Sequence, residues 1–174
     1  MKRIDLIVKI AFFEALLILF SKISFNLPFS PVPFTFQVLG VFLVGLFLKP
    51  YQSLTAMVIY ILMGAIGLPV FAKGGGLAYL FGITGGFIFG FLFAAVLISF
   101  LKEKIRSVAG TFLALLLGLI VIYLSGAFYM AFFTGKGFAA VFSLAVVPFV
   151  PLDLIKAVIA LLVYRAYVSA VKPL

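Results

Sequence analysis

Long apolar runs, separated by short connections rich in proline, glycine and lysine, constrain this chain more than any other feature. A helix that crosses a bilayer needs roughly 20 apolar residues, and the 174 residues hold about six such runs with little left over. Hydrophobic residues make up 67% of the chain and charged residues 10%, against about 45–50% and 25% in soluble domains. We therefore predict an all-α integral membrane protein with six transmembrane helices, forming a single transmembrane domain over residues 1–174.

The connections set the bounds of the expected helices. These helices cover residues 4–25, 34–48, 51–65, 84–101, 108–130 and 151–167. Pro28, Pro31 and Pro33 follow the first helix and favour extended structure, because proline is excluded from a helix interior. The second and third helices are short for a bilayer core of about 30 Å, and tilt or burial of their ends under adjoining loops would reconcile their length.

Basic residues divide unequally between the two ends of the expected helices. If the N-terminus is cytoplasmic, nine lie on the inside, namely Lys2, Arg3, Lys9, Lys49, Lys102, Lys104, Arg106, Arg165 and Lys172. Three lie on the outside, namely Lys22, Lys73 and Lys136. This distribution follows the positive-inside rule, so both termini are predicted to be cytoplasmic. The formal charge of +9 then reflects membrane topology, and no nucleic acid partner is expected.

One stretch breaks the apolar pattern in the middle of the chain. Residues 64–90 read GAIGLPVFAKGGGLAYLFGITGGFIFG, and we expect residues 67–82 to be a non-helical insert. Such backbone is tolerated at membrane depth only where protein buries it or where it lines a cavity. With the predicted topology, the insert meets two proline-rich connections, residues 28–33 and 148–151, on the outer side. We therefore interpret the insert as the wall or lid of a binding site.

Glu14, Asp153 and Lys156 fall inside the expected helices, where charge is costly and usually faces an interior or a cavity. Asp153 and Lys156 are three residues apart, which places them on one helix face. They form either a self-satisfied ion pair that specifies packing or a polar clamp for a ligand, and we favour the clamp. Three roles are possible for Glu14: it pairs with a basic residue, it faces the cavity, or it contacts a partner protein. Its neighbours Ala11 and Ala15 form a small-residue face suited to close helix contact.

Weaker candidates lie near the same outer level. Thr35 and Gln37 begin the second helix and are either interfacial residues or pocket groups, since an amide both donates and accepts hydrogen bonds. Tyr79 is either an interfacial residue or a pocket residue. The chain contains no Cys and no His, and it carries no phosphate-binding loop or hydrolase motif. We therefore predict neither an enzyme nor a resident metal or cofactor.

Four segments in this order resemble the BioY family, the biotin-binding S components of energy-coupling factor transporters. The segments are Pro33-Phe34-Thr35-Phe36-Gln37, Gly64-Ala65-Ile66-Gly67-Leu68-Pro69-Val70-Phe71, Gly82-Ile83-Thr84-Gly85-Gly86-Phe87 and Pro151-x-Asp153-x-x-Lys156. The resemblance covers nearly the whole chain. Ile83 and Phe87 depart from the proline and tyrosine usual in the family, while Asp153 and Lys156 match it.

The resemblance implies a high-affinity biotin-binding subunit in a prokaryotic plasma membrane. Its site would lie near the outer face under the loop between the first two helices, with Asp153, Lys156, Thr35, Gln37, Gly75, Tyr79, Gly85, Gly86 and Phe87 as substrate-binding residues. Asp153 would accept the ureido N–H groups, and Lys156 would meet either the ureido oxygen or the carboxylate. Ala11 and Ala15 would dock on a transmembrane coupling subunit, and two cytoplasmic ATPases would supply the energy.

Two other functions remain open at this point. A secondary transporter driven by an ion gradient would use Glu14 or Asp153 as its proton or sodium site. A structural membrane protein would bind no small vitamin.

Overall fold

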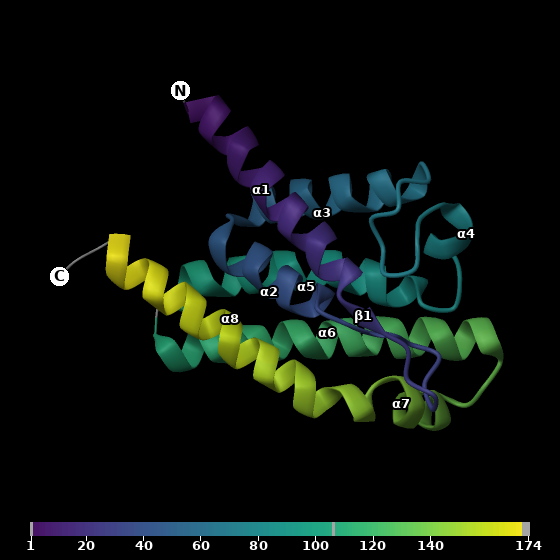
Figure 1. The fold of residues 1–174 in the computed structure, drawn as a ribbon. Coiled ribbons are helices and arrows are strands. Elements are labelled where there is room, and N and C mark those ends of the chain that lie inside the picture. Colours follow the sequence, from purple (N-terminus) through teal and green to yellow (C-terminus); the bar gives the residue numbers. More distant parts are fainter. Residues whose placement is uncertain (1, 106, 172–174) are drawn as a thin grey trace.

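The computed structural model describes residues 2–105 and 107–171 and is dominated by helices (Figure 1). The longer helices in these ranges are α1 (Lys2–Lys22), α2 (Gln37–Phe47), α3 (Pro50–Ala65), α5 (Gly85–Lys104), α6 (Val108–Thr134) and α8 (Val150–Val171). The shorter elements are the strands β1 (Ser24–Phe25) and β2 (Phe34–Thr35), the helices α4 (Leu77–Leu80) and α7 (Phe138–Ala145), and the 3-10 helix η1 (Val147–Phe149).

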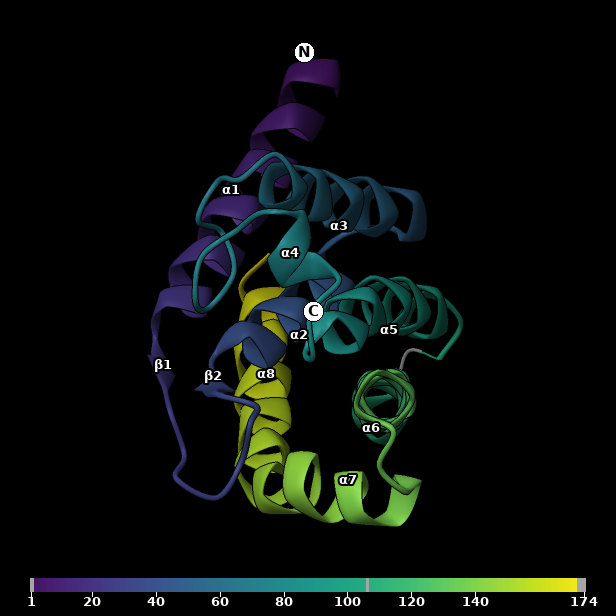
Figure 2. The ribbon, with the colours of Figure 1, turned by 90° about the vertical axis from the view of Figure 1, so that its right-hand side faces the viewer.

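Helix α2 forms the centre of the bundle. Each of its residues from Gln37 to Leu46 is buried, and it contacts α1, α3, α5, α6 and α8. Figure 2, which views the bundle end-on, shows these helices arranged around it. A helix that is apolar on every side is expected in such a position, and burial by its neighbours explains how a helix of 11 residues is accommodated.

Three helical stretches are long and apolar enough to cross a membrane. They are α5, α6 and the continuous segment Phe138–Val171, which contains α7, η1 and α8. Helix α2 is a shorter apolar helix. The first residues of α1 and the last of α8 lie toward the same end of the bundle, and the connection between β1 and β2, the insert and the turn before α7 lie toward the other end (Figure 1).

The start of the chain departs from the all-α expectation. The first helix ends at Lys22 and not at residue 25, and β1 then pairs with β2 in an antiparallel register that sets Ser24 opposite Thr35. The prolines between the two strands explain this, because they exclude helix and leave an extended loop that returns on itself. Helix α2 begins only at Gln37, whose backbone N–H donates to Thr35 Oγ1 at 3.2 Å.

The insert is irregular apart from the single turn α4. Gly74 and Gly76 have φ values of 135° and 99°, which residues with a Cβ rarely adopt. Three side chains from neighbouring helices donate to carbonyls of the insert: Lys22 Nζ to Phe71 O at 2.9 Å, Tyr60 Oη to Val70 O at 3.0 Å and Tyr129 Oη to Phe81 O at 2.9 Å. The predicted non-helical segment is therefore ordered by contacts with α1, α3 and α6.

The last two long helices follow the predicted order with altered ends. Ser107 caps α6, since its Oγ accepts from the Gly110 N–H at 3.0 Å, and α6 continues to Thr134 instead of ending near residue 130. Before α8, the chain forms α7 and η1 where only an apolar lead-in was expected. Pro151 lies in the first turn of α8 as predicted, where its missing N–H needs no partner.

Candidate functional site

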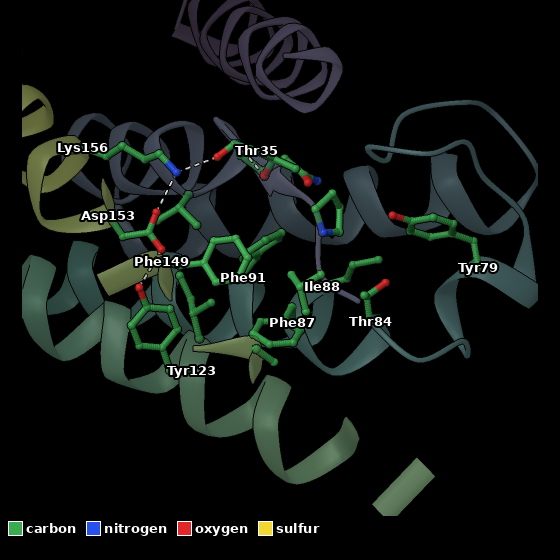
Figure 3. Close-up of a pocket in the computed structure, with 16 residues that line it drawn as sticks. Thr35, Tyr79, Thr84, Phe87, Ile88, Phe91, Tyr123, Phe149, Asp153 and Lys156 are labelled. Carbon is green, nitrogen blue, oxygen red and sulfur yellow. Dashed lines mark hydrogen bonds and ion pairs between the residues drawn. The ribbon is translucent and has the colours of Figure 1, made fainter. Parts of the chain in front are cut away.

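A cavity of about 60 Å³ lies where the start of α8 faces β2, α4 and the start of α5. The polar residues of its lining are Asp153, Lys156, Tyr123, Thr35, Gln37, Tyr79 and Thr84. Figure 3 shows Asp153, Lys156, Thr35 and Tyr123 gathered at one end, Tyr79 and Thr84 at the other, and the apolar side chains of Phe87, Ile88 and Phe91 between them. The cavity thus has two polar ends and an apolar middle.

Asp153 and Lys156 form a buried ion pair at the first end. Lys156 Nζ lies 2.6 Å from Asp153 Oδ1, and the two residues are only 3% and 4% exposed. The spacing of three residues on α8 brings them to one face, as the sequence predicts. Removing one member of such a pair leaves an uncompensated buried charge, which costs about 3–5 kcal/mol.

The backbone of β2 and its neighbours complete the surroundings of the lysine. Lys156 Nζ also donates to Thr35 O at 2.6 Å, so the strand pair that ends the proline-rich loop determines where this carbonyl lies. The ammonium is 4.1 Å from the centre of the Phe34 ring and 5.7 Å from that of Phe36, and such contacts stabilise a cation. An ammonium has three N–H donors, and the two named contacts leave one for a ligand.

Tyr123 on α6 holds the second carboxylate oxygen. Its hydroxyl donates to Asp153 Oδ2 at 2.7 Å, so the carboxylate is fixed at both oxygens. Each oxygen retains accepting capacity, because a carboxylate offers about four lone-pair sites. Tyr123 was not predicted as a site residue. Helix α6 also carries Tyr129, Thr111 and Ser125, so nothing in its sequence singles out the Tyr123 hydroxyl.

Gln37 links the cavity wall to the insert. Its side chain lines the cavity, and its Nε2 donates to Tyr60 Oη at 2.7 Å. The same tyrosine donates to Val70 O, and its ring contacts Phe71 edge-on with centres 5.4 Å apart. Phe71 in turn stacks on Tyr79 at 5.3 Å, which lines the other end of the cavity.

Thr84 and Tyr79 supply hydroxyl groups at the second end. Thr84 is the N-cap residue of α5, and its side chain makes no capping hydrogen bond within the described helix. The N-terminus of a helix of 20 residues favours negative charge through its free N–H groups and dipole. Burial raises the pKa of the Tyr79 phenol, so this hydroxyl keeps its proton and can donate.

Six of the predicted substrate-binding residues line this cavity. They are Asp153, Lys156, Thr35, Gln37, Tyr79 and Phe87. Lining residues that the sequence analysis did not select, besides Tyr123 and Thr84, are Val32, Pro33, Val38, Ile88, Phe91, Ile122, Ala145 and Phe149. Most of these are apolar residues in apolar segments, so nothing in the sequence distinguishes them from packing residues.

Three predicted glycines lie outside the described lining, and each is in close contact with neighbouring atoms. A Cβ on Gly75 would meet the Leu68 carbonyl oxygen, and one on Gly85 would meet the Leu80 carbonyl oxygen. A Cβ on Gly86 would collide with the Tyr129 side chain. Gly85 and Gly86 thus allow α5 to approach α4 and α6, and Gly75 allows two parts of the insert to approach each other.

The candidates on α1 also lie away from the cavity. Ala11 and Ala15 are exposed, as the docking hypothesis requires. Glu14 is buried at 6% exposure and does not belong to the described lining. Both of its carboxylate oxygens lack a hydrogen-bond partner within residues 2–105 and 107–171. Over the same ranges, no group of three acidic side chains is positioned to hold a metal.

Comparisons with known proteins agree with this architecture. A model of the BioY family matches residues 1–173. The biotin transporter BioY of Thermotoga maritima is 42% identical over 158 residues, which are 90% of this chain and 92% of that protein. The probable biotin transporter BioY of Pyrococcus horikoshii is 39% identical and covers 88% of this chain and 90% of its own length.

A solved structure shares the fold. The crystal structure of the S-component for biotin from an ECF-type ABC transporter matches with a TM-score of 0.89 at 26% sequence identity, covering 95% of this chain and 92% of that one. The matches extend over nearly the full length and include the segments that form the cavity. The chain therefore belongs to the BioY family.

Proposed function

We propose that this protein is the high-affinity biotin-binding S component of an ATP-driven importer. The observation that carries the proposal is the arrangement of polar groups at the two ends of the cavity with apolar side chains between them (Figure 3). Biotin has the matching pattern, with a ureido ring at one end, a carboxylate at the other and an apolar bicycle and chain between. Relatives at 42% and 39% identity are named as biotin transporters.

The contacts suggest one orientation for biotin. The Asp153 carboxylate, held by Lys156 and Tyr123, accepts a ureido N–H, and the remaining N–H of Lys156 donates to the adjacent ureido oxygen. The carboxylate of biotin then lies at the N-terminus of α5 beside the hydroxyls of Thr84 and Tyr79. A helix N-terminus suits this group, which supports placing Lys156 at the ureido end.

Entry of the ligand requires the cavity to widen. A water needs about 10–15 Å³ of such space, so about 60 Å³ holds roughly four to six waters, which is less than biotin occupies. Val32 and Pro33 form the part of the lining that belongs to the loop between β1 and β2, and residues 26, 28, 29 and 31 of this loop are exposed. We therefore assign the opening movement to this loop, which covers the site.

The membrane arrangement follows from the same proposal. Besides the three helical stretches that are long and apolar enough to span, α1, α2 and α3 would complete six transmembrane helices in a single domain. The termini are placed in the cytoplasm because the excess of lysine and arginine lies at their end. The cavity then faces the outside of a prokaryotic plasma membrane.

Energy would come from other subunits. The sequence has no phosphate-binding loop, and the related S-component is described as part of an ECF-type ABC transporter. We propose a transmembrane coupling subunit and two cytoplasmic ATPases as partners, with Ala11 and Ala15 at the docking face of α1. ATP is then used only by those partners.

One observation supports a second function. Glu14 is a buried carboxyl that lacks a partner among the described residues, and such groups often mark ion or proton pathways in membranes. A secondary transporter driven by an ion gradient would use it. A secondary transporter needs only an ion gradient for uptake, whereas the ATP-driven importer needs its coupling and ATPase subunits and ATP.

Biotin uptake into proteoliposomes separates the two. We expect no uptake by the protein alone under a proton or sodium gradient, and uptake once the coupling and ATPase subunits are incorporated with ATP. Gradient-driven accumulation without those subunits, abolished by Glu14→Gln, would establish the secondary transporter instead.

A further inference from the structure

A second, larger groove lies at the end of the bundle opposite the cavity. Its volume is about 1250 Å³, and it is bounded by the start of α3, the end of α5, the start of α6 and the last turns of α8 (Figure 1). The biotin-binding proposal makes no use of it. Its basic and apolar side chains occupy different parts of the groove. The basic residues lie at the helix ends, and the apolar and aromatic residues lie along α8.

Three basic residues line this groove. Lys49 and Arg165 are exposed, and the ion pairs formed by described residues do not include either of them. Lys102 donates to Leu46 O at 2.8 Å and to Leu48 O at 3.2 Å, which satisfies the end of α2 and leaves its third N–H free. Glu103 is the single acid in the described lining, so the groove carries a positive excess and fits an anion.

The groove also offers an apolar surface that a small inorganic anion would not need. Val108 and Val168 line it together with Tyr164 and Tyr167. The rings of these tyrosines contact Phe47 edge-on, with centres 5.5 Å and 5.1 Å away. Tyrosines are enriched at the level of lipid headgroups, and the groove lies where α5 ends and α6 begins, which is the level of a membrane surface for helices that span it.

We propose that this groove binds an anionic phospholipid, with the phosphate between Lys49, Lys102 and Arg165 and an acyl chain along α8. Basic pockets between transmembrane helices are suited to such headgroups. The described lining of the groove contains no residue of α1, so the groove is distinct from the docking face at Ala11 and Ala15. Helix α6, which forms one side of the groove, lies across the bundle from α1 (Figure 2). The inference depends on the chain spanning a membrane and is independent of biotin binding.

Native mass spectrometry of the purified full-length protein tests the proposal. The protein is mixed with equal amounts of phosphatidylglycerol and phosphatidylcholine of identical acyl chains, and the bound fraction of each is measured. We expect preferential retention of phosphatidylglycerol. Since each basic residue near a membrane surface contributes about 1 kcal/mol, Arg165→Gln and Lys49→Gln should each weaken retention about fivefold.

Lys136→Gln is the matched control, because Lys136 is an exposed lysine in the turn between α6 and α7, outside the groove. It should leave retention unchanged, and thermal unfolding should confirm that all variants fold. Equal retention of both lipids, or an equal loss in Lys136→Gln, would overturn the proposal. Complete displacement of the lipid by millimolar inorganic phosphate would show a free-anion site, and loss of coupling-subunit capture with unchanged lipid retention would show a protein interface. Either result would also refute it.

Discussion

At the scale of single residues, the buried Asp153 carboxylate depends on the groups that hold it. Lys156 occupies one oxygen and Tyr123 the other, both at short distances. Hydrogen bonds to charged groups contribute about 1.5–3 kcal/mol each. An aspartate fixed in this way presents its remaining lone pairs to a ligand in one orientation, without first losing rotational freedom.

Replacing Tyr123 by Phe should therefore weaken biotin binding. The ring keeps its apolar contacts while Asp153 Oδ2 loses its donor, and the expected loss is about tenfold in Kd, measured by calorimetric titration. Tyr129→Phe is the matched control, since the Tyr129 hydroxyl bonds to Phe81 O and lies outside the described lining. Unchanged or tighter binding by Tyr123→Phe would show that this hydroxyl does not position the carboxylate.

A second residue tests the proposed orientation of biotin. Thr84→Val removes the hydroxyl at the N-terminus of α5 but keeps the branched shape, so biotin should bind about tenfold more weakly. The methyl ester of biotin, which has no carboxylate charge, should lose little. Thr55→Val, at a half-buried position of α3 outside the described lining, serves as the control. Equal losses for biotin and its ester would contradict the placement of the carboxylate at this end.

The sequence predicts the site best where charge is concentrated. Asp153 and Lys156 stand out because ionisable residues are costly inside apolar helices, and the structure brings them together on one face of α8. Gly75, Gly85 and Gly86 were expected at the ligand; they are not among the described lining residues, and an added Cβ on each would meet neighbouring backbone or side-chain atoms. A glycine in the sequence does not reveal whether a ligand or another backbone approaches it.

At the scale of structural elements, the insert is held by its neighbours. Lys22 at the end of α1 and Tyr60 in the middle of α3 bond to adjacent carbonyls of the insert. Tyr60 also accepts from Gln37, which lines the cavity. The wall formed by Tyr79 is thereby linked through Phe71 and Tyr60 to helices far from it in sequence.

Tyr60→Phe should loosen this wall. The change leaves Val70 O and the Gln37 amide without their buried partner, which costs about 1–3 kcal/mol, and the protein should unfold at lower temperature. Hydrogen exchange at the amides of residues 74–76 should become faster. Tyr51→Phe, at an exposed position at the start of the same helix, is the control. Unchanged exchange in Tyr60→Phe would show that the insert is ordered by other contacts.

The boundaries of the helices and strands show how much of the fold can be predicted from the sequence. The apolar runs predict all six longer helices in the right order, and the capping residue Ser107 explains why α6 begins at the predicted position. The pairing of β1 with β2 was not predicted, because it depends on a contact between segments ten residues apart. Helix α7 was missed because its apolar sequence resembles the start of the following helix.

At the scale of the whole molecule, one side of α1 faces outward. Ile4, Ile7, Val8, Phe12 and Leu19 are all exposed there, together with Ala11 and Ala15. Small residues flanked by large apolar ones allow close helix contact within a membrane. A coupling subunit that packs on this face would leave the cavity, which lies near the start of α8, untouched.

Ala15→Trp should accordingly separate binding from transport. Biotin affinity of the isolated protein should stay the same, while uptake with the coupling and ATPase subunits should fall about tenfold or more, the size of effect typical of a blocked interface centre. Ala166→Trp, an exposed alanine of α8, controls for bulk alone. Loss of biotin affinity in Ala15→Trp would mean that this face packs within the protein.

The central claim is that this fold recognises biotin through the Asp153–Lys156 pair, and calorimetric titration of the purified protein tests it most directly. The wild-type protein should bind one biotin and release no binding heat with thiamine or riboflavin. Asp153→Asn should bind biotin about tenfold to a hundredfold more weakly, while Glu103→Gln, which alters an exposed acid at the far end of α5, should bind as the wild type does. Absence of biotin binding, equal binding of thiamine or riboflavin, or an unchanged affinity in Asp153→Asn would contradict the claim.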